Sequence, residues 1–312
     1  MKKKAQAATA RRFTSCATLA ALGIKLRSMK LLEPIGRNVR VPQKTIRHTP
    51  LQKLTDAFIA ILSGARGLVE INTRVRSDSG LQRAFGRAGC AEQSVVQETL
   101  NACTAQTVTQ MERAVDEIFR HHSLAFKHHY TESLQILDVD LSGMPCGPKA
   151  ALSCKGYFSK EGIRYGRQLG RVAATLYEEV VVDRLFPGNA KLTEALQPLV
   201  LATEATLALD ETRRTRTLLR IDAGGGSLGD VNWCLERGYQ MHCKDFSSAR
   251  AEALATTVKQ WHDDPQHGGR QLGFCHGGSF GLCASSAPLS PALADEERTD
   301  QIWSADLDAL SA

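Results

Sequence analysis

The spacing of apolar residues separates the chain into a helical part and a part that alternates between strands and helices. Between residues 48 and 130, apolar side chains recur every three or four positions, which is typical of amphipathic helices. The segments with this pattern are residues 50–64, 79–103 and 107–129. The middle segment contains a short glycine-rich stretch and predicts two helices joined by a turn, about the size of a helix-turn-helix.

From residue 134 onward the pattern changes to short β-branched or leucine-rich runs. The predicted strands are residues 134–143, 166–177, 178–188, 217–226 and 239–245, and the predicted helices between and after them are residues 191–209, 227–238 and 248–264. Three consecutive strands followed by alternating helices and strands predict a mixed sheet with helices on its faces. After residue 270 both periods disappear, so we expect little packed structure there.

The charge of the chain is concentrated at its N-terminal end. Of the 39 basic residues, twelve lie between Met1 and Pro50 together with one acid, Glu33, whereas the rest of the chain carries 27 basic and 32 acidic residues. A basic arm on a mildly acidic body favours a polyanion partner, because neutralised phosphates release counterions. A solvated, flexible tail is the alternative interpretation.

The cysteines and the hydropathy favour a reduced, cytoplasmic protein. The nine cysteines are odd in number and show no C-x-x-C spacing, which argues against a disulfide framework and against a zinc site. No apolar run reaches the roughly 18 residues of a membrane span, so no membrane association is expected.

Two strand-like segments end in aspartate. Asp138 and Asp140 lie two positions apart in LQILDVDLSG, so on a strand they share one face, and Asp222 closes TLLRIDAGGG just before three glycines. The predicted topology makes these two strands neighbours. Converging carboxylates on a rigid sheet are suitable ligands for hard divalent cations, although isolated aspartates at strand ends are common.

Residues 48–265 resemble the DDE-type transposases of bacterial insertion sequences, whose catalytic core is RNase H-like. The matching stretches are HTPLQKLTDAFIAILSGARGLVEINTRVR, FGRAGCAEQSVVQETL, LDVDLSGMPCG, KGYF, GRQLGRVAATLYEEVVVDRLFPGN, LLRIDAGGG and NWCLERGYQ. The resemblance implies that Asp140, in a D-x-S sequence, is the first catalytic acid and Asp222 the second, with Asp138 as the fallback. It also implies two Mg²⁺ (or Mn²⁺) ions in an intact relative, with Asp140 and Asp222 as ligands.

The third acid of that family is missing from the expected pattern. Such transposases carry a glutamate in a late Y-x-x-R-x-x-x-E helix, and no such pattern occurs in this sequence. Glu296 and Glu297 are compatible with a helix, but nothing around them matches. Loss of the resemblance, of the periodicity and of the glutamate coincide near Arg270, which suggests a frameshift or a premature stop.

Six polar side chains are candidate DNA contacts. Those on or near the second strand are suited to the phosphate backbone, and those on the second helix of the predicted helix-turn-helix are suited to base edges. They are Arg167, Arg171 and Lys155 on the strands and Gln93, Ser94 and Gln97 on the helix. Ordinary solvation of the surface and common helix packing are the alternatives.

Together these features predict a mixed α+β chain with four parts: a basic, partly disordered arm (1–47), an α-helical domain (48–130), a partial RNase H-like domain that is incomplete at its C-terminus (131–270), and an irregular tail (271–312). The expected function is that of a transposase acting on double-stranded DNA with terminal inverted repeats, as a homo-oligomer in a bacterial cytoplasm. Without its third acid it would be catalytically defective. A DNA-binding fragment that inhibits transposition, a non-functional remnant, and a nuclease of the same fold are the alternatives.

Overall fold

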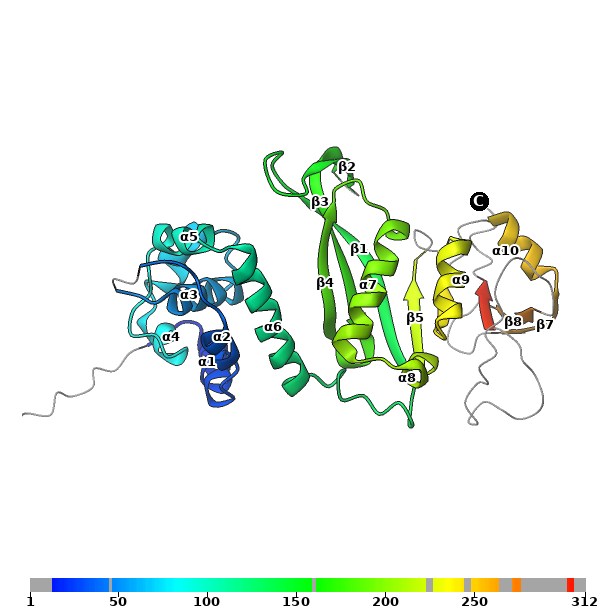
Figure 1. Ribbon diagram of the computed structural model, residues 1–312, viewed down its shortest axis with the longest axis horizontal. Coiled ribbons are helices and arrows are strands. Elements are labelled where there is room, and N and C mark those ends of the chain that lie inside the picture. The colour runs from blue at the N-terminus through cyan, green and yellow to red at the C-terminus, as the bar shows by residue number, and fades with distance from the viewer. Residues whose placement is uncertain are drawn as a thin grey trace, which may run out of the picture. The chain divides into compact units, whose positions relative to one another are not determined.

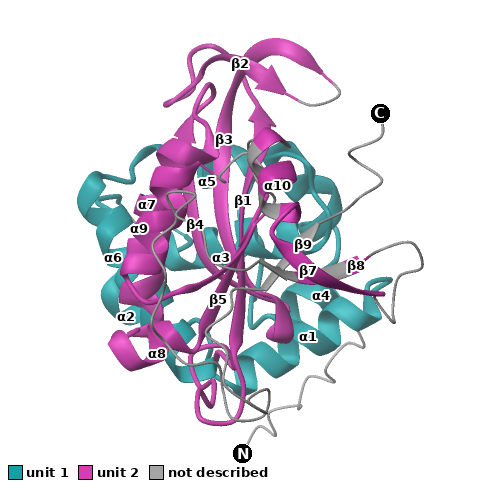
Figure 2. Ribbon diagram, turned by 90° about the vertical axis from the view of Figure 1, so that its right-hand side faces the viewer, with its two compact units in different colours: residues 1–122 teal, residues 123–312 magenta. Residues whose placement is uncertain are grey.

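The computed structural model describes residues 13–44, 47–158, 161–222, 227–243, 248–263, 271–275 and 302–305. The chain forms two compact units, residues 1–122 and 123–312, which Figures 1 and 2 show. Each unit is treated separately below. Among the described residues, no helix has the length and hydropathy needed to cross a membrane.

Unit 1 is helical. Its α-helices are α1 (Ala17–Ser28), α2 (Glu33–Asn38), α3 (Pro50–Leu62), α4 (Ser79–Ala84), α5 (Gln93–Asn101) and α6 (Ala105–His122). A capping box starts α3, since the Thr49 hydroxyl accepts from the Gln52 backbone and the Gln52 side chain accepts from the Thr49 backbone. Pro50 at the first helical position strengthens this start.

Two helices lie within the segment expected to be a partly disordered arm. On α1, Leu19, Ala20 and Leu26 pack against the core of the unit. Gly23 is buried beside Phe85, where an added Cβ would lie 2.5 Å from a ring carbon. The apolar face of α1 is therefore ordered by a core that residues 59–96 supply. Residues 1–12 and 45–46 of the expected arm lie outside the described residues.

A buried ion pair holds the loop between α4 and α5 to α3. Asp56 is fully buried and accepts hydrogen bonds from Arg87 Nε (2.7 Å), Arg87 Nη2 (2.9 Å) and the Ala91 backbone (2.8 Å). Every partner is a donor, so the carboxylate is well satisfied despite its burial.

Unit 2 is built on a six-stranded mixed sheet. Its strands are β1 (Gln135–Pro145), β2 (Cys154–Phe158), β3 (Gly162–Ala174), β4 (Glu179–Pro187), β5 (Thr217–Ile221) and β6 (Gln240–Cys243). The lateral order is β4-β3-β1-β5-β6, with β2 beside the far end of β3. Pairs β1–β3 and β3–β4 are antiparallel, whereas β1–β5 and β5–β6 are parallel. This mixed sheet is the predicted fold class, although β2, between the first and second predicted strands, was not predicted.

Helices flank this sheet. They are α7 (Leu192–Leu207), α8 (Glu211–Thr215) and α9 (Leu228–Glu236). Figure 1 shows α7 lying along β1, β3 and β4. Gly170 on β3 permits this approach, because a Cβ there would lie 2.9 Å from a methyl carbon of Leu199. The buried residues Leu137, Val139 and Val172 therefore define the face covered by α7.

The long helix predicted over residues 107–129 ends earlier, at His122. Glu179 on β4 accepts hydrogen bonds from the Ser123 hydroxyl (2.5 Å) and from the backbone N–H groups of Leu124 (2.9 Å) and Ala125 (3.1 Å). Burial would raise the pKa of Glu179, but these hydrogen bonds outweigh it and lower the pKa. A tertiary contact, invisible to helical periodicity, therefore diverts the chain here.

The helix predicted over residues 248–264 is also shorter than expected. The helix α10 (Ser248–Ala255) is followed by β7 (Val258–Asp263), which pairs with β8 (Gln271–Cys275), and β8 pairs with β9 (Ile302–Ala305). The β-branched run Thr256–Thr257–Val258 disfavours continuation of the helix. Within 271–312, where an irregular tail was expected, the described residues are these two strands.

Breaking the buried ion pair should destabilise unit 1 strongly. We expect Asp56→Ala to lower the free energy of unfolding by about 3–5 kcal/mol, because Arg87 would remain buried without its partner. Asp116→Ala, which removes an exposed partner of Arg120 in the same unit, should cost about 0–1 kcal/mol. Denaturant unfolding followed by circular dichroism measures both; equal costs would contradict the assignment.

The stability of unit 2 should depend on pH through His128. This side chain is 6% exposed, accepts from the Tyr177 hydroxyl (2.7 Å) and donates from Nε2 to the Ser133 carbonyl (3.1 Å). Burial lowers the pKa of His128 below the ordinary value. The stabilisation that neutral His128 contributes is therefore fully present above the unfolded pKa of about 6.5 and is lost as the pH falls towards the folded pKa.

We therefore expect the melting temperature to fall between pH 7.5 and pH 5.5 as assayed by calorimetry, and to fall less in His128→Gln. The matched variant is His129→Gln, at the exposed neighbouring position. An unchanged pH dependence in His128→Gln would contradict the prediction.

Candidate functional site

The register of the parallel pair β1–β5 aligns two aspartates. Asp138 pairs with Arg220, and Val139 with Ile221. One step further along each chain come Asp140 and Asp222. Neighbouring strands lie about 4.8 Å apart, so the two carboxylates start from adjacent backbone positions.

Asp140 lies on the sheet face opposite α7, and Asp222 is the first residue after β5. The side chains of Asp138 and Arg220 form an ion pair, so they share a face, and Asp140, two positions after Asp138 on β1, points the same way. The alternate residues Leu137, Val139 and Ile221 are buried on the other face. Asp140 and Asp222 are both exposed, and Asp140 Oδ1 accepts from the Leu141 backbone at 2.7 Å.

Asp138 is occupied by an ion pair. Arg220 donates to it twice, from Nε (2.5 Å) and from Nη2 (2.7 Å), and also contacts the Thr175 hydroxyl at 3.3 Å. The hydrogen bond to Asp138 is the main reason that the pKa of Arg220 is raised. A carboxylate held by a bidentate guanidinium is a poor cation ligand, so the geometry favours Asp140 over Asp138.

A row of charges crosses the sheet at the level of Asp140. In register it runs from Asp183 on β4 to Arg171 on β3 and Asp140 on β1, with Asp222 following β5. Arg171 donates from Nε (2.7 Å) and Nη2 (2.9 Å) to Asp183, which raises the pKa of Arg171. A DNA phosphate would therefore have to compete with Asp183 for Arg171.

The other two predicted strand contacts lie further along the same face. Lys155 on β2 is exposed, and its Nζ is 5.8 Å from the centre of the Tyr165 ring. Arg167 on β3 has a buried Nε without a hydrogen-bond partner among the described residues. Neither forms an ion pair within the described part of the chain, so both remain suited to an anion.

The predicted helix contacts lie on α5 in unit 1. Ser94 and Gln97 are exposed, with Gln97 donating to Asn101 at 2.8 Å, whereas Gln93 is half-buried. The connection from α4 to α5 spans residues 85–92 and is fastened by the Asp56–Arg87 pair. It is longer than the three- or four-residue turn of a helix-turn-helix.

The acidic pair suits a divalent cation only as a partial site. Mg²⁺ is commonly bound through one or two carboxylates, with waters and substrate phosphates completing its octahedron. Within the described ranges, no cluster of three or more His, Cys, Asp or Glu side chains is arranged to hold a metal. Glu296 and Glu297 lie outside those ranges.

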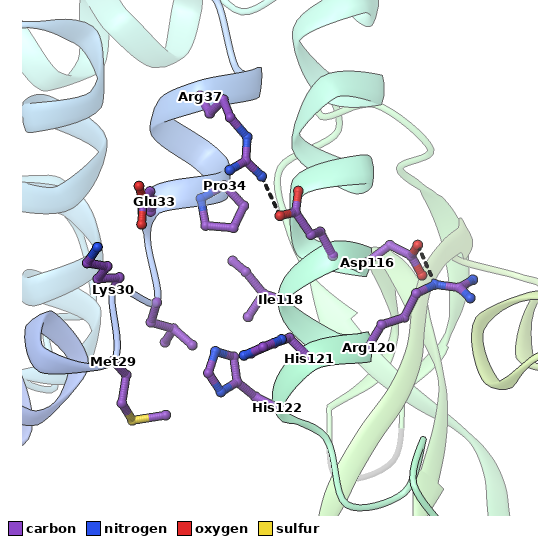
Figure 3. Close-up of a pocket in the computed structure, with 12 residues that line it drawn as sticks. Met29, Lys30, Glu33, Pro34, Arg37, Asp116, Ile118, Arg120, His121 and His122 are labelled. Atoms are coloured by element: carbon purple, nitrogen blue, oxygen red, sulfur yellow. Dashed lines mark hydrogen bonds and ion pairs between the residues drawn. The ribbon is translucent and has the colours of Figure 1, made fainter.

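Unit 1 contains a cavity of about 620 Å³ beside α2 and α6 (Figure 3). Two ion pairs at its lining, Arg37–Glu117 and Arg120–Asp116, join residues of opposite charge. Figure 3 shows His121 and His122 next to each other in the lining of this cavity, at the end of α6. The charged side chains that line the cavity have both signs, which does not favour binding of an anion such as phosphate.

Two residues that shape the acidic site were not predicted from the sequence: Arg220 and Asp183. Arg220 lies two positions before Asp222, so strand alternation could have placed it on the acidic face. The pairing of Asp183 with Arg171 depends on the register of β3 and β4, which shifts between Val172 and Ala173. Sequence alternation alone could not have located it.

No family model matches the chain, and no curated protein matches it. A solved structure of the piggyBac transposase synaptic complex with hairpin DNA is similar, with a TM-score of 0.40 and 12% sequence identity, over 85% of this chain and 60% of that chain. The chain thus spans about 60% of that transposase, and the similarity is too low to assign function or site residues.

Binding of Mn²⁺ should depend on Asp140 and Asp222. We expect Asp140→Asn and Asp222→Asn each to weaken Mn²⁺ binding by at least about 10-fold, since even outer-shell losses cost that much. The double variant Asp138→Asn/Arg220→Gln removes the ion pair without changing net charge and should leave affinity unchanged. Titration followed by electron paramagnetic resonance measures this; the opposite order of effects would assign the site to Asp138.

Proposed function

We propose that the chain is a DDE-type insertion-sequence transposase whose core has kept two of its three acids and has lost transposition activity. The observation that carries the proposal is the parallel register of β1 and β5, in which Asp140 and Asp222, both exposed, directly follow the paired residues Val139 and Ile221. The reaction class is phosphoryl transfer on DNA, comprising strand cleavage and strand transfer.

The residues of the chain have separate roles in this proposal. Asp140 and Asp222 would hold a divalent cation, Mg²⁺ or Mn²⁺, from two adjacent strands, which fix the positions of their backbones before DNA arrives. When bound, the ion would supply Lewis-acid polarisation of the scissile phosphate. Lys155 and Arg167 neutralise backbone phosphates on the same face. The ion pair with Arg220 keeps the Asp138 carboxylate from competing for the cation.

The proposed defect follows from the incomplete set of acids. Asp138 is bound to Arg220, and no third carboxylate joins Asp140 and Asp222 among the residues that the structure describes. Loss of one stabilising group at such a site lowers the rate by about 10²–10³-fold or more. The chain therefore binds DNA and one ion weakly but does not complete transposition.

A second candidate is a DNA-binding protein without chemistry. It is favoured by the charge of residues 1–50, which contain twelve basic residues and one acid. Such a chain would occupy double-stranded DNA at the terminal inverted repeats, or join mixed oligomers with an active copy, and would thereby inhibit transposition.

Cleavage of DNA with element ends separates the two candidates. With Mn²⁺ we expect weak nicking of a supercoiled plasmid, abolished by Asp222→Asn and unaffected by Glu194→Gln, an equivalent charge change at an exposed position on α7. Gel electrophoresis measures nicked product.

Binding without nicking would support the inhibitor. Efficient strand transfer would show that a third acid lies outside the described residues and would overturn the proposed defect. Nicking that survives both Asp140→Asn and Asp222→Asn would overturn the site.

A further inference from the structure

The face that carries Asp140 continues onto a projecting β-hairpin. Past the region covered by α7, β2 pairs with the start of β3, so that Lys155 lies opposite Tyr165 and Tyr157 opposite Ile163. Figure 1 shows β2 and this part of β3 extending beyond the end of α7. Along β3, Tyr165 and Arg171 are six residues apart and point to the same face, since strand side chains alternate.

The two faces of the hairpin differ sharply. One face buries Phe158, which is 2% exposed and would be met at 2.6 Å and 2.3 Å by Cβ atoms added to Gly143 and Gly166. The other face leaves Tyr157 74% exposed and Ile163 78% exposed. The hairpin is thus anchored on one side and presents aromatic and aliphatic side chains on the other.

The hairpin is also positively charged. Residues 143–168 contain five basic residues and one acid, Glu161, and Glu161 is already paired with Arg164. On the exposed face, Lys155 lies near the Tyr165 ring, and the half-buried Arg167, two residues beyond Tyr165 on β3, forms no ion pair within the described part of the chain. Unpaired cations beside exposed aromatic rings form a complementary surface for a polyanion with π-faces.

The spacing of the two tyrosines suits nucleobases. Tyr157 and Tyr165 are diagonal neighbours across the β2–β3 pair, a position at which residues lie about 7–8 Å apart. This is about twice the 3.5–4.0 Å contact distance between carbon atoms, so the spacing of the two positions matches that of two rings with one base stacked between them. Bases in a duplex are stacked on one another, so only an unpaired strand offers both faces.

We propose that the exposed face of the β2–β3 hairpin binds an unpaired DNA strand, with bases stacked on Tyr157 and Tyr165 and phosphates held by Lys155 and Arg167. The inference rests on the proposed function in taking this strand to be the DNA handled at Asp140 and Asp222. The six residues of β3 from Tyr165 to Arg171 span about 20 Å. A DNA strand of that length that begins at the acidic pair therefore reaches the hairpin. The net positive charge opposes pairing with the same face of a second copy.

The test measures binding without chemistry. A fluorescein-labelled oligothymidylate of about 20 nucleotides, longer than the ~4–16 nucleotides of known single-strand sites, is titrated with the full chain in EDTA while anisotropy is recorded. We expect Tyr157→Ala/Tyr165→Ala to weaken binding by about 5- to 100-fold, the range that stacking of one base supports. A duplex of equal length should lose much less affinity.

Matched variants keep the result specific. Tyr157→Phe/Tyr165→Phe should retain affinity, whereas Tyr157→Leu/Tyr165→Leu, which keeps apolar area, should lose it. Leu201→Ala, a truncation at an exposed position on α7, should have no effect. Circular dichroism confirms that each variant is folded.

Several outcomes would overturn the proposal. Equal losses for single strand and duplex would assign the face to phosphate contacts alone. Unchanged DNA affinity, with an oligomer that becomes a monomer in light scattering, would assign it to a second copy. The binding assay contains no metal, so it tests the hairpin separately from the acidic pair. Single-strand binding that persists in Asp140→Asn, a variant that lacks nicking, supports the hairpin. An unmodified chain that nicks DNA but does not bind the single strand refutes the hairpin without refuting the proposed function.

Discussion

The parallel pairing of β1 with β5 is the interaction on which the chemistry of this sheet depends. Its register sets Leu137 against Leu219 on the face covered by α7 and Asp138 against Arg220 on the other. A slip of one residue in either strand would turn its charged side chain into the apolar core. Burial of an unpaired charge is too costly for that, so the hydrophobic face of the sheet fixes the position of the carboxylates on its polar face.

Two exposed ion pairs then decide which carboxylates remain suited to a cation. Arg220 engages Asp138, and Arg171 engages Asp183. Exposed pairs of this kind contribute only about 0–1 kcal/mol to stability. Their consequence is local: they neutralise the charges beside Asp140, which itself forms no ion pair with either arginine in the described part of the chain. The same face becomes cationic and aromatic only further along, on the hairpin.

The sequence predicted most elements of unit 2 because their side-chain periods were strong. The runs around Asp140 and Asp222 gave β1 and β5, and the leucine pattern of residues 191–209 gave α7. It missed α1, because apolar residues such as Leu22 and Ile24 also lie on its exposed side, so no single apolar face stands out, and burial of the packed face depends on Phe85 and a core formed elsewhere. It overextended α6, because the contacts of Glu179 that divert the chain at residue 123 come from a distant strand.

Local alternation was therefore enough to nominate Asp138, Asp140 and Asp222 as carboxylates on strand segments, since side-chain direction on a strand follows from parity alone. Whether two such strands are neighbours was predicted only through the order of elements. The choice between Asp138 and Asp140 required the tertiary structure. It rests on the guanidinium of Arg220, about eighty residues away in sequence but opposite Asp138 in register. Contacts between strands are decided by how the sheet packs, and a single strand's pattern does not contain that information.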